Sequence, residues 1–116
     1  YIPSKPTRKG LKLWLRCDNI TGFCHQLELY LGRDQYKRTS VGQTVVEKLT
    51  ESLEGKNFHV FYDSLFTTVA LSRSLLEMRI LSCGTIVRKR KGFPSDLKNI
   101  PGLSQGEYRY NWYYQL

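Results

Sequence analysis

One acidic side chain stands where parallel sheets usually gather their reactive groups. Asp63 closes the apolar run 58–63, and Ser64 and a helical pattern follow it. In open α/β sheets, ligands and reactive groups collect just beyond the carboxyl ends of the parallel strands. A carboxylate at that place suits a divalent metal ion. The alternative is an Asp that caps the following helix through its first amides, and position alone favours the cap.

The remaining acidic residues do not complete an active site. Two-metal phosphoryl transfer needs several carboxylates that converge on ions about 3.5–4 Å apart. Asp18 precedes turn residues, where a local hydrogen bond from its side chain accounts for it. Four glutamates fall on helical patterns and are interpreted as solvated faces: Glu47, Glu51, Glu54 and Glu77. From the residues alone, Asp63 is a single candidate ligand.

The densest positive charge lies in one run, Arg88, Lys89, Arg90 and Lys91. The chain has 18 basic and 10 acidic residues and a net charge of +8. Basic side chains that neutralise phosphates release counterions, so the run could lie along a DNA backbone. The alternative is a solvated, self-repelling cluster that keeps an edge strand from aggregating. We favour DNA contact.

The cysteines give little sign of a metal site or of a disulfide framework. Cys17, Cys24 and Cys83 are odd in number and lack C-x-x-C spacing, and two histidines add no second ligand pair. Cys17 and Cys83 lie in strand-like runs and are expected to be small buried hydrophobes. This usage indicates a reducing, intracellular compartment. No apolar run approaches the roughly 18 residues that a membrane span needs.

The first half of the chain predicts a hairpin and a helix. Residues 11–18 and 25–32 alternate apolar and polar side chains on either side of turn residues, which is typical of two antiparallel strands. Ser40 and Gln43 fit a capping box. Apolar residues then recur at helical spacing as far as a stop signal at Gly55.

The second half predicts a strand–helix–strand unit. The nearly continuous apolar run 58–63 is typical of a strand that is buried on both faces. Thr67 or Thr68 caps a second helix, and residues 81–87 form another strand. These lengths fit a βαβ crossover, so we expect one mixed sheet with packed helices. The aromatic segment 107–114 is either a further strand or an end without a partner strand.

Several short motifs occur in a fixed order over most of the chain. They are Tyr1-Ile-Pro-Ser-Lys-Pro6, Gly10-Leu-Lys-Leu-Trp14, Asp18-x-x-Thr21-Gly22, Tyr30-x-Gly32, Asp63-Ser-Leu-Phe-Thr-Thr68, Cys83-Gly-Thr85 with Arg88, and Lys91-Gly-x-Pro94. Together they resemble the piggyBac transposase family, which includes mobile-element transposases and proteins domesticated from them. The resemblance runs from residue 1 to about residue 98 and fades beyond.

The resemblance implies a fold and a chemistry. The family's catalytic core has an RNase H-like α/β fold, which agrees with the mixed sheet and flanking helices expected from the patterns. Three aspartates in the family hold divalent ions, Mg²⁺ or Mn²⁺, that cleave and join DNA, and Asp63 matches the second. The implied partners are DNA, as transposon ends and TTAA target sites, and a possible homodimer, with no membrane. The implied localisation is nuclear.

The resemblance also predicts an incomplete core. The family's first aspartate lies on a strand before the Tyr-Pro-Lys-Pro motif and would precede Tyr1, while the third has no match downstream. The C-terminal catalytic helix and the Cys/His-rich zinc domain have no counterpart either. We therefore expect residues 1–98 to form a partial DDE transposase catalytic domain and residues 99–116 a divergent tail.

Three functions are compatible with these features. The first is a segment of a transposase core that supplies Asp63 and is inactive on its own. The second is a domesticated, non-catalytic module that binds DNA or protein. The third, another RNase H-like nuclease, is disfavoured by the motifs at residues 1–6 and 83–85. The missing strand also predicts that the isolated piece folds poorly or self-associates through an exposed edge.

Overall fold

The computed structural model describes residues 4, 6, 10–32 and 40–112. The elements along the chain are β1 (Leu13–Cys17), β2 (Cys24–Leu29), α1 (Val41–Thr50), the 3₁₀ turn η2 (Glu51–Leu53), β3 (His59–Tyr62), α2 (Val69–Glu77), β4 (Leu81–Gly84) and α3 (Ser95–Lys98). The predicted order of four strands and two helices is confirmed, and η2 and α3 are additions. None of the described helices is long and apolar enough to cross a membrane.

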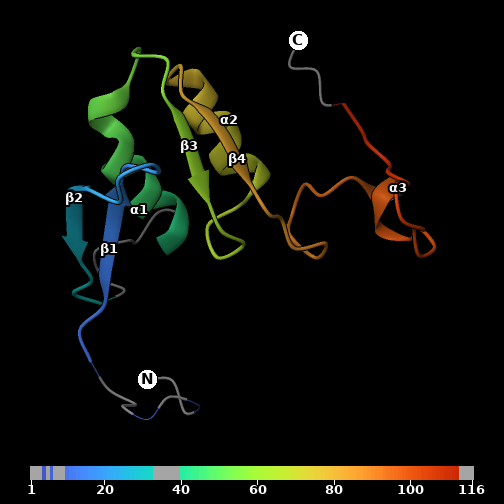
Figure 1. The fold of residues 1–116 in the computed structure, drawn as a ribbon, viewed down its shortest axis with the longest axis horizontal. Coiled ribbons are helices and arrows are strands. Elements are labelled where there is room, and N and C mark those ends of the chain that lie inside the picture. Colours follow the sequence, from blue (N-terminus) through green and yellow to red (C-terminus); the bar gives the residue numbers. More distant parts are fainter. Residues whose placement is uncertain (1–3, 5, 7–9, 33–39, 113–116) are drawn as a thin grey trace.

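Strands β1 and β2 form the predicted antiparallel hairpin (Figure 1). Trp14 pairs with Glu28, and the register shifts by one residue before Cys17, which pairs with Cys24. Such a shift is a β-bulge, with two residues of one strand opposite one of the other. The bulge leaves His25 as the additional residue of β2.

The turn of the hairpin is organised by Asp18, as predicted. Its Oδ2 accepts hydrogen bonds from the amide of Thr21 at 2.7 Å and from the Thr21 hydroxyl at 2.8 Å, and the amide of Ile20 lies at 3.1 Å. The hydrogen bonds from Thr21 are the main reason that the pKa of Asp18 lies below its ordinary value. The carboxylate therefore stabilises its own turn.

Helix α1 covers one face of the hairpin through the side chains that alternate inward. Trp14 is only 8% exposed and packs against Val45 and Leu49. The Nη1 of Arg16 donates to the carbonyl of Leu49 at 2.8 Å and to the hydroxyl of Ser52 at 3.0 Å. A cation at a helix C-terminus complements the free carbonyls there, so Arg16 ties β1 to the end of α1.

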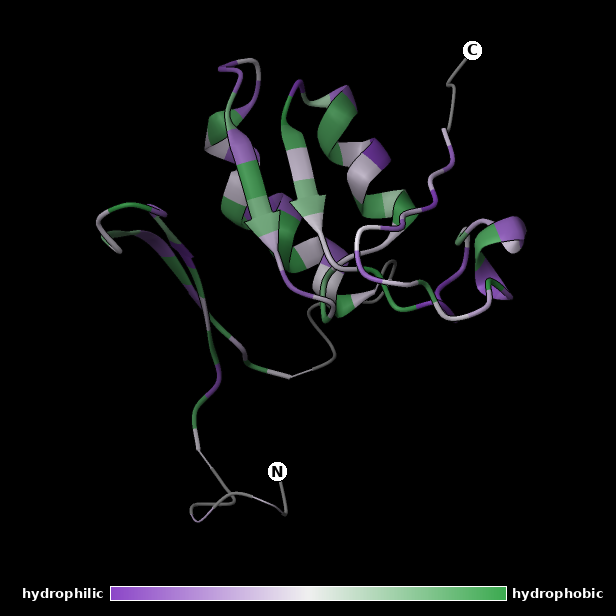
Figure 2. Cartoon of the chain, turned by 45° about the vertical axis from the view of Figure 1, so that its right-hand side comes forward, coloured by the Kyte–Doolittle hydropathy of each residue, from purple (hydrophilic) through white to green (hydrophobic). Residues whose placement is uncertain are grey.

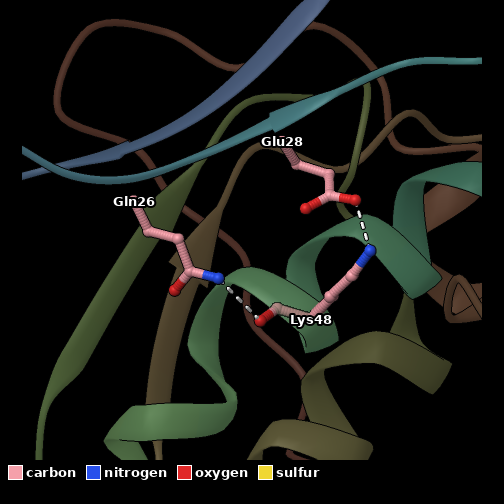
Figure 3. A network of polar contacts seen from close by, with 3 residues as sticks. All are labelled: Gln26, Glu28 and Lys48. Atoms are coloured by element: carbon pink, nitrogen blue, oxygen red, sulfur yellow. Dashed lines mark hydrogen bonds and ion pairs between the residues drawn. The ribbon is translucent and has the colours of Figure 1, made fainter.

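A second set of polar contacts joins the neighbouring strand to the same helix. In Figure 3 the Nε2 of Gln26 donates to the main-chain carbonyl of Lys48 at 3.4 Å, while the ammonium group of Lys48 pairs with the carboxylate of Glu28. Gln26 and Glu28 lie two residues apart in β2, on one face of the strand. Both strands of the hairpin are thus attached to α1.

The start of α1 confirms half of the expected capping box. The Ser40 hydroxyl accepts from the amide of Gln43 at 3.3 Å. The side chain of Gln43 does not return the bond, because its Nε2 donates to Glu47 at 2.9 Å. Glu47 also accepts from the hydroxyl of Ser74 at 2.7 Å. The interpretation of Glu47 as a solvated residue was wrong: it is half-buried and links α1 to α2.

Strands β3 and β4 are parallel, and α2 connects them, as the βαβ pattern predicts. Thr68 is the cap of α2, and its hydroxyl accepts from the amide of Leu71 at 3.0 Å. Leu71, Leu75 and Ile80 are fully buried. These three side chains form the centre of the larger core cluster.

The strands form two separate pairs, so the prediction of one mixed sheet was wrong for the described residues. β1 pairs with β2 alone and β3 pairs with β4 alone. In Figure 1 the arrows of β2 and β3 point the same way, so β1, which is antiparallel to β2, runs opposite to β3. What the structure supports is a small mixed α/β fold with two small sheets.

Helices cover only one face of each strand pair, and this overturns two predictions about burial. In Figure 2 apolar segments lie on the strands, and no helix lies over the face of the strands that is turned toward the viewer. Leu15 is 55% exposed and Phe61 is 63% exposed, so residues 58–63 are not buried on both faces. Cys17 and Cys83 are exposed rather than buried. The described residues supply no second layer to cover them.

The segment after α3 has no regular structure within residues 99–112. Its aromatic side chains are exposed, and the rings of Tyr108 and Tyr110 stack at 6.1 Å. No strand forms at residues 107–112, and residues 113 and 114 lie outside the described part. The proposed domain division at residue 98 stays a prediction.

Candidate functional site

Asp63 forms a tight turn between β3 and α2. Its Oδ1 accepts from the amide of Leu65 at 2.8 Å, and its main-chain carbonyl accepts from the amides of Phe66 and Thr67, each at 3.2 Å. The residue is exposed. Within the described ranges, Oδ2 has no hydrogen-bond partner. Because Thr68 caps α2, Asp63 holds the turn and leaves one carboxylate oxygen available.

The turn is fixed from the other side by the close approach of β4. A Cβ on Gly84 would lie 2.4 Å from Oγ1 of Thr67 and 2.7 Å from the carbonyl of Tyr62. Thr67 itself donates its hydroxyl to the carbonyl of Asp63 at 2.7 Å. A side chain at position 84 would therefore push on the turn that carries Asp63. This contact is a physical reason for the glycine in the Cys83-Gly-Thr85 motif.

Tyr62 strengthens the same region by joining three elements. Its hydroxyl lies 3.0 Å from the hydroxyl of Ser72 in α2 and 3.0 Å from that of Ser82 in β4. The residue before Asp63 is thus held by both neighbours of β3. A carboxylate on so constrained a backbone is well placed for a role that needs fixed geometry.

Arg90 brings the basic run to this turn. Its Nη2 donates to the carbonyls of Ser64 and Leu65, both at 3.1 Å. The Arg90 side chain is itself half-buried. Arg90 therefore positions the segment, and its neighbours Arg88 and Lys89 are exposed to solvent.

Gly92 closes the basic segment against α2. Its φ is +87°, a conformation that glycine adopts without steric cost. A Cβ there would also lie 3.1 Å from the side chain of Val69. The glycine of the Lys91-Gly-x-Pro94 motif thus lets the chain turn closely over the start of α2.

A groove of about 480 Å³ separates the two strand pairs. Its walls are residues 14–19 of β1 and its turn and residues 58–63 of β3, and its floor includes Val45, Val46 and Leu49 of α1. Asp63 lies at its edge. Trp14 also lines it, and the indole N–H of Trp14 is buried without a hydrogen-bond partner among the described residues.

The described residues do not fit a complete metal site. No group of three or more His, Cys, Asp or Glu side chains comes together in the part of the chain that the structure describes. Asp18 borders the same groove, but its carboxylate is occupied by the hairpin turn. Asp63 can thus contribute one ligand, and further ligands would have to come from elsewhere.

The structural roles of two residues of this region were not identified from the sequence. Gly84 was noted only as part of a motif, because the clash of a Cβ at this position with Thr67 cannot be inferred without the sheet register. Arg90 was grouped with its neighbours as a DNA contact, and nothing in the sequence signals its bonds to the carbonyls of residues 64 and 65. Both depend on tertiary contacts.

Comparison with known proteins defines the class. A family model described as Transposase IS4 matches residues 1–114. The match covers nearly the whole chain, so the chain belongs to this transposase family. It also extends through most of the segment after residue 98.

Within that class, the resemblance to piggyBac transposases is confirmed. The chain is similar to the piggyBac transposase whose cryo-EM structure shows a synaptic complex with hairpin DNA, with a TM-score of 0.77 and 30% sequence identity. The similarity covers 93% of this chain and 22% of that transposase chain. This chain therefore spans about a fifth of its structural relative.

Proposed function

We propose that this chain is a segment of the catalytic core of a piggyBac-type DNA transposase. In this role Asp63 is one of the aspartates that hold Mg²⁺ or Mn²⁺, and Arg88, Lys89 and Lys91 contact the DNA backbone. The observation that carries the proposal is the 30% identical match to a piggyBac transposase that was solved on DNA. Transposon ends and TTAA targets are the proposed DNA partners, and the nucleus is the proposed site of action.

The turn geometry supports the role of Asp63. One oxygen is fixed by the Leu65 amide at 2.8 Å, which orients the carboxylate, and the other has no partner among the described residues. Carboxylate oxygens are the ligands that hard divalent cations prefer. Since one carboxylate cannot hold two ions, the chain alone is expected neither to nick nor to join DNA.

The position of the basic run supports DNA contact. Arg90 anchors the run to the turn of Asp63 through two carbonyls at 3.1 Å. Phosphate contacts from Lys and Arg position a nucleic acid without reading its sequence. A backbone bound by the exposed members of the run would pass close to Asp63, where the chemistry of the complete enzyme is proposed.

The groove between β1 and β3 supports an incomplete sheet. Neighbouring strands lie about 4.7–4.9 Å apart, and here two strand edges border a groove without a strand between them. We assign the place to a strand of the complete core that carries another metal-holding aspartate. A strand parallel to β3 would bring its carboxyl end next to Asp63, and one of its carbonyls could accept from the indole of Trp14.

DNA binding by the chain itself tests the basic run. We compare Lys89→Ala/Lys91→Ala with a control, Lys56→Ala/Lys98→Ala, which removes the same charge at other exposed positions. Each phosphate contact contributes about 0.9 to the slope of log K against log salt for duplex DNA. The first variant should reduce the slope by about 1–2 and the control by much less. Equal slopes for both variants would remove the assignment.

A chimaera tests Asp63. The corresponding segment of the related piggyBac transposase is replaced by this chain, and excision of transposon-end DNA is measured with Mg²⁺ or Mn²⁺. Asp63→Asn should reduce excision to background while DNA binding is retained. Asp96→Asn, which alters another exposed carboxylate, should leave excision unchanged. Full activity of the Asp63→Asn chimaera would overturn the proposed role.

A further inference from the structure

Two of the three cysteines face each other across the hairpin and are separated in the sequence by the six residues of its turn. Cys17 at the end of β1 pairs in register with Cys24 at the start of β2. Both thiols are free and exposed. The Sγ of Cys24 lies 3.4 Å from the main-chain carbonyl of Gln26, to which it donates. Neither the transposase chemistry nor the DNA contacts proposed above use this pair.

The hydrogen bonds of the hairpin indicate the type of pair. The amide of Tyr30 donates to the carbonyl of Lys12 at 2.9 Å, and beyond the cysteines the amide of Asp18 donates to the carbonyl of Phe23 at 2.8 Å. Bonded and non-bonded pairs alternate along an antiparallel ladder, so Cys17 occupies a non-hydrogen-bonded position. Regular pairs of this type have Cα atoms about 4.5 Å apart, and disulfides span about 4.4–6.8 Å, so a disulfide also tolerates a pair that a bulge displaces from the regular spacing.

We propose that Cys17 and Cys24 form a dithiol site that a peroxide oxidises reversibly to a cross-strand disulfide. One sulfur takes an oxygen atom from the peroxide, which gives a sulfenic acid and, from hydrogen peroxide, water. The second thiolate attacks that sulfur, the S–S bond forms, and the hydroxyl leaves as a second water. Two thiols are oxidised and one peroxide is reduced.

The Cys17 thiol responds to its neighbour across the hairpin. Partial desolvation, followed by the nearby Cys24 thiol, raises the pKa of the Cys17 thiol above its ordinary value. The disulfide would fix the bulge beside Arg16 and Cys17, in the hairpin that borders the groove.

Peptide mapping of the full chain after treatment with hydrogen peroxide tests the proposal. Trypsin cleaves after Arg16 and Arg33, so both cysteines fall in one peptide, while Cys83 falls in residues 80–88. The peptide 17–33 should lose two hydrogens, and the count of free thiols should fall from three to one. Dithiothreitol should restore all three.

Serine variants separate the pair from general thiol oxidation. Cys83→Ser should form the same disulfide at the wild-type rate. Cys17→Ser and Cys24→Ser should form no disulfide within peptide 17–33, and the remaining thiol should accumulate as a sulfenic or sulfinic acid, because no second thiol is then held close by to resolve the sulfenic acid. Amide exchange in β1 and β2 checks that each variant keeps the hairpin. Equal oxidation of all three cysteines, or disulfides only between chains, would overturn the proposal.

Discussion

The β3–α2–β4 unit and the β1–β2 hairpin differ in how each is held. The first has three fully buried side chains, Leu71, Leu75 and Ile80, between its helix and its strands. The hairpin buries a single large side chain, Trp14, and depends on polar bonds from Arg16 to the end of α1. The turn of Asp63 belongs to the better packed unit.

The difference shows how one helix can pack against two small sheets. Val45 and Leu49 of α1 pack with Trp14, whereas Val46 packs with the cluster of α2. The groove opens between these two contacts. The unit that carries Asp63 is rigid through its own core, while the hairpin is attached to it mainly through α1.

The largest expected effect is on the core of the β3–α2–β4 unit. Leu75→Ala removes a fully buried side chain, so it should lower the free energy of opening of α2 by about 2–5 kcal/mol. Leu15→Ala, at a site that is 55% exposed, should change stability by less than about 0.5 kcal/mol. Hydrogen exchange of the α2 amides measures both effects. Similar losses of protection in the two variants would contradict the difference in packing between the β3–α2–β4 unit and the hairpin.

The close approach of β4 to the Asp63 turn gives the next effect. Gly84→Ala places a Cβ against Thr67 and Tyr62, so overpacking should cost about 1–3 kcal/mol of unfolding free energy. Gly102→Ala is the matched control, because a Cβ there meets nothing within 4 Å. Local exchange at residues 63–67 reports the change. If Gly84→Ala left the unfolding free energy unchanged, β4 could move away from β3 without cost.

A smaller effect is expected where the hairpin meets α1. Arg16→Ala removes two hydrogen bonds to Leu49 and Ser52, and should cost about 1 kcal/mol, seen as faster exchange in β1 and β2. Amides of α2 should keep their protection. Arg109→Ala, which removes an arginine from an exposed position in the tail, is the control. Equal loss of protection in α2 would mean that the two regions open together.

The smallest effect is a dependence of the hairpin on pH. Hydrogen bonds from Thr21 lower the pKa of Asp18 in the folded hairpin, so their contribution is present above the ordinary pKa of an aspartate. It is lost as the pH falls below about 4 and through the lowered value. Asp18→Asn should flatten this dependence in β1 and β2 exchange, and an unchanged profile would assign the pH effect to other groups.

Local patterns predicted the elements well and the tertiary arrangement poorly. The hairpin strands, a cap at Thr67 or Thr68 and a crossover to a strand at 81–87 were predicted from neighbouring residues. The structure selects Thr68 and ends the strand at Gly84. The apolar run 58–63 also located Asp63 correctly at the end of a strand. Its turn bond to Leu65 could not be separated from a helix cap by position alone.

The errors share one physical cause. Burial of residues 58–63 and of Cys17 and Cys83 was expected from apolar character, which says that a side chain prefers cover but not whether a second layer exists. The single mixed sheet was expected from strand order, which does not show that a groove separates β1 from β3. Both predictions assumed contacts that the described residues do not supply.

The bonds of Arg90 to Ser64 and Leu65 make the carboxylate of Asp63 depend on a residue far along the chain. A DNA duplex bound by the side chains at positions 88, 89 and 91 would transmit any displacement of this segment through Arg90 to the carbonyls of Ser64 and Leu65. In the proposed transposase core, DNA contact and the orientation of the Asp63 carboxylate would then be connected through the guanidinium of Arg90, with no rearrangement of either strand pair.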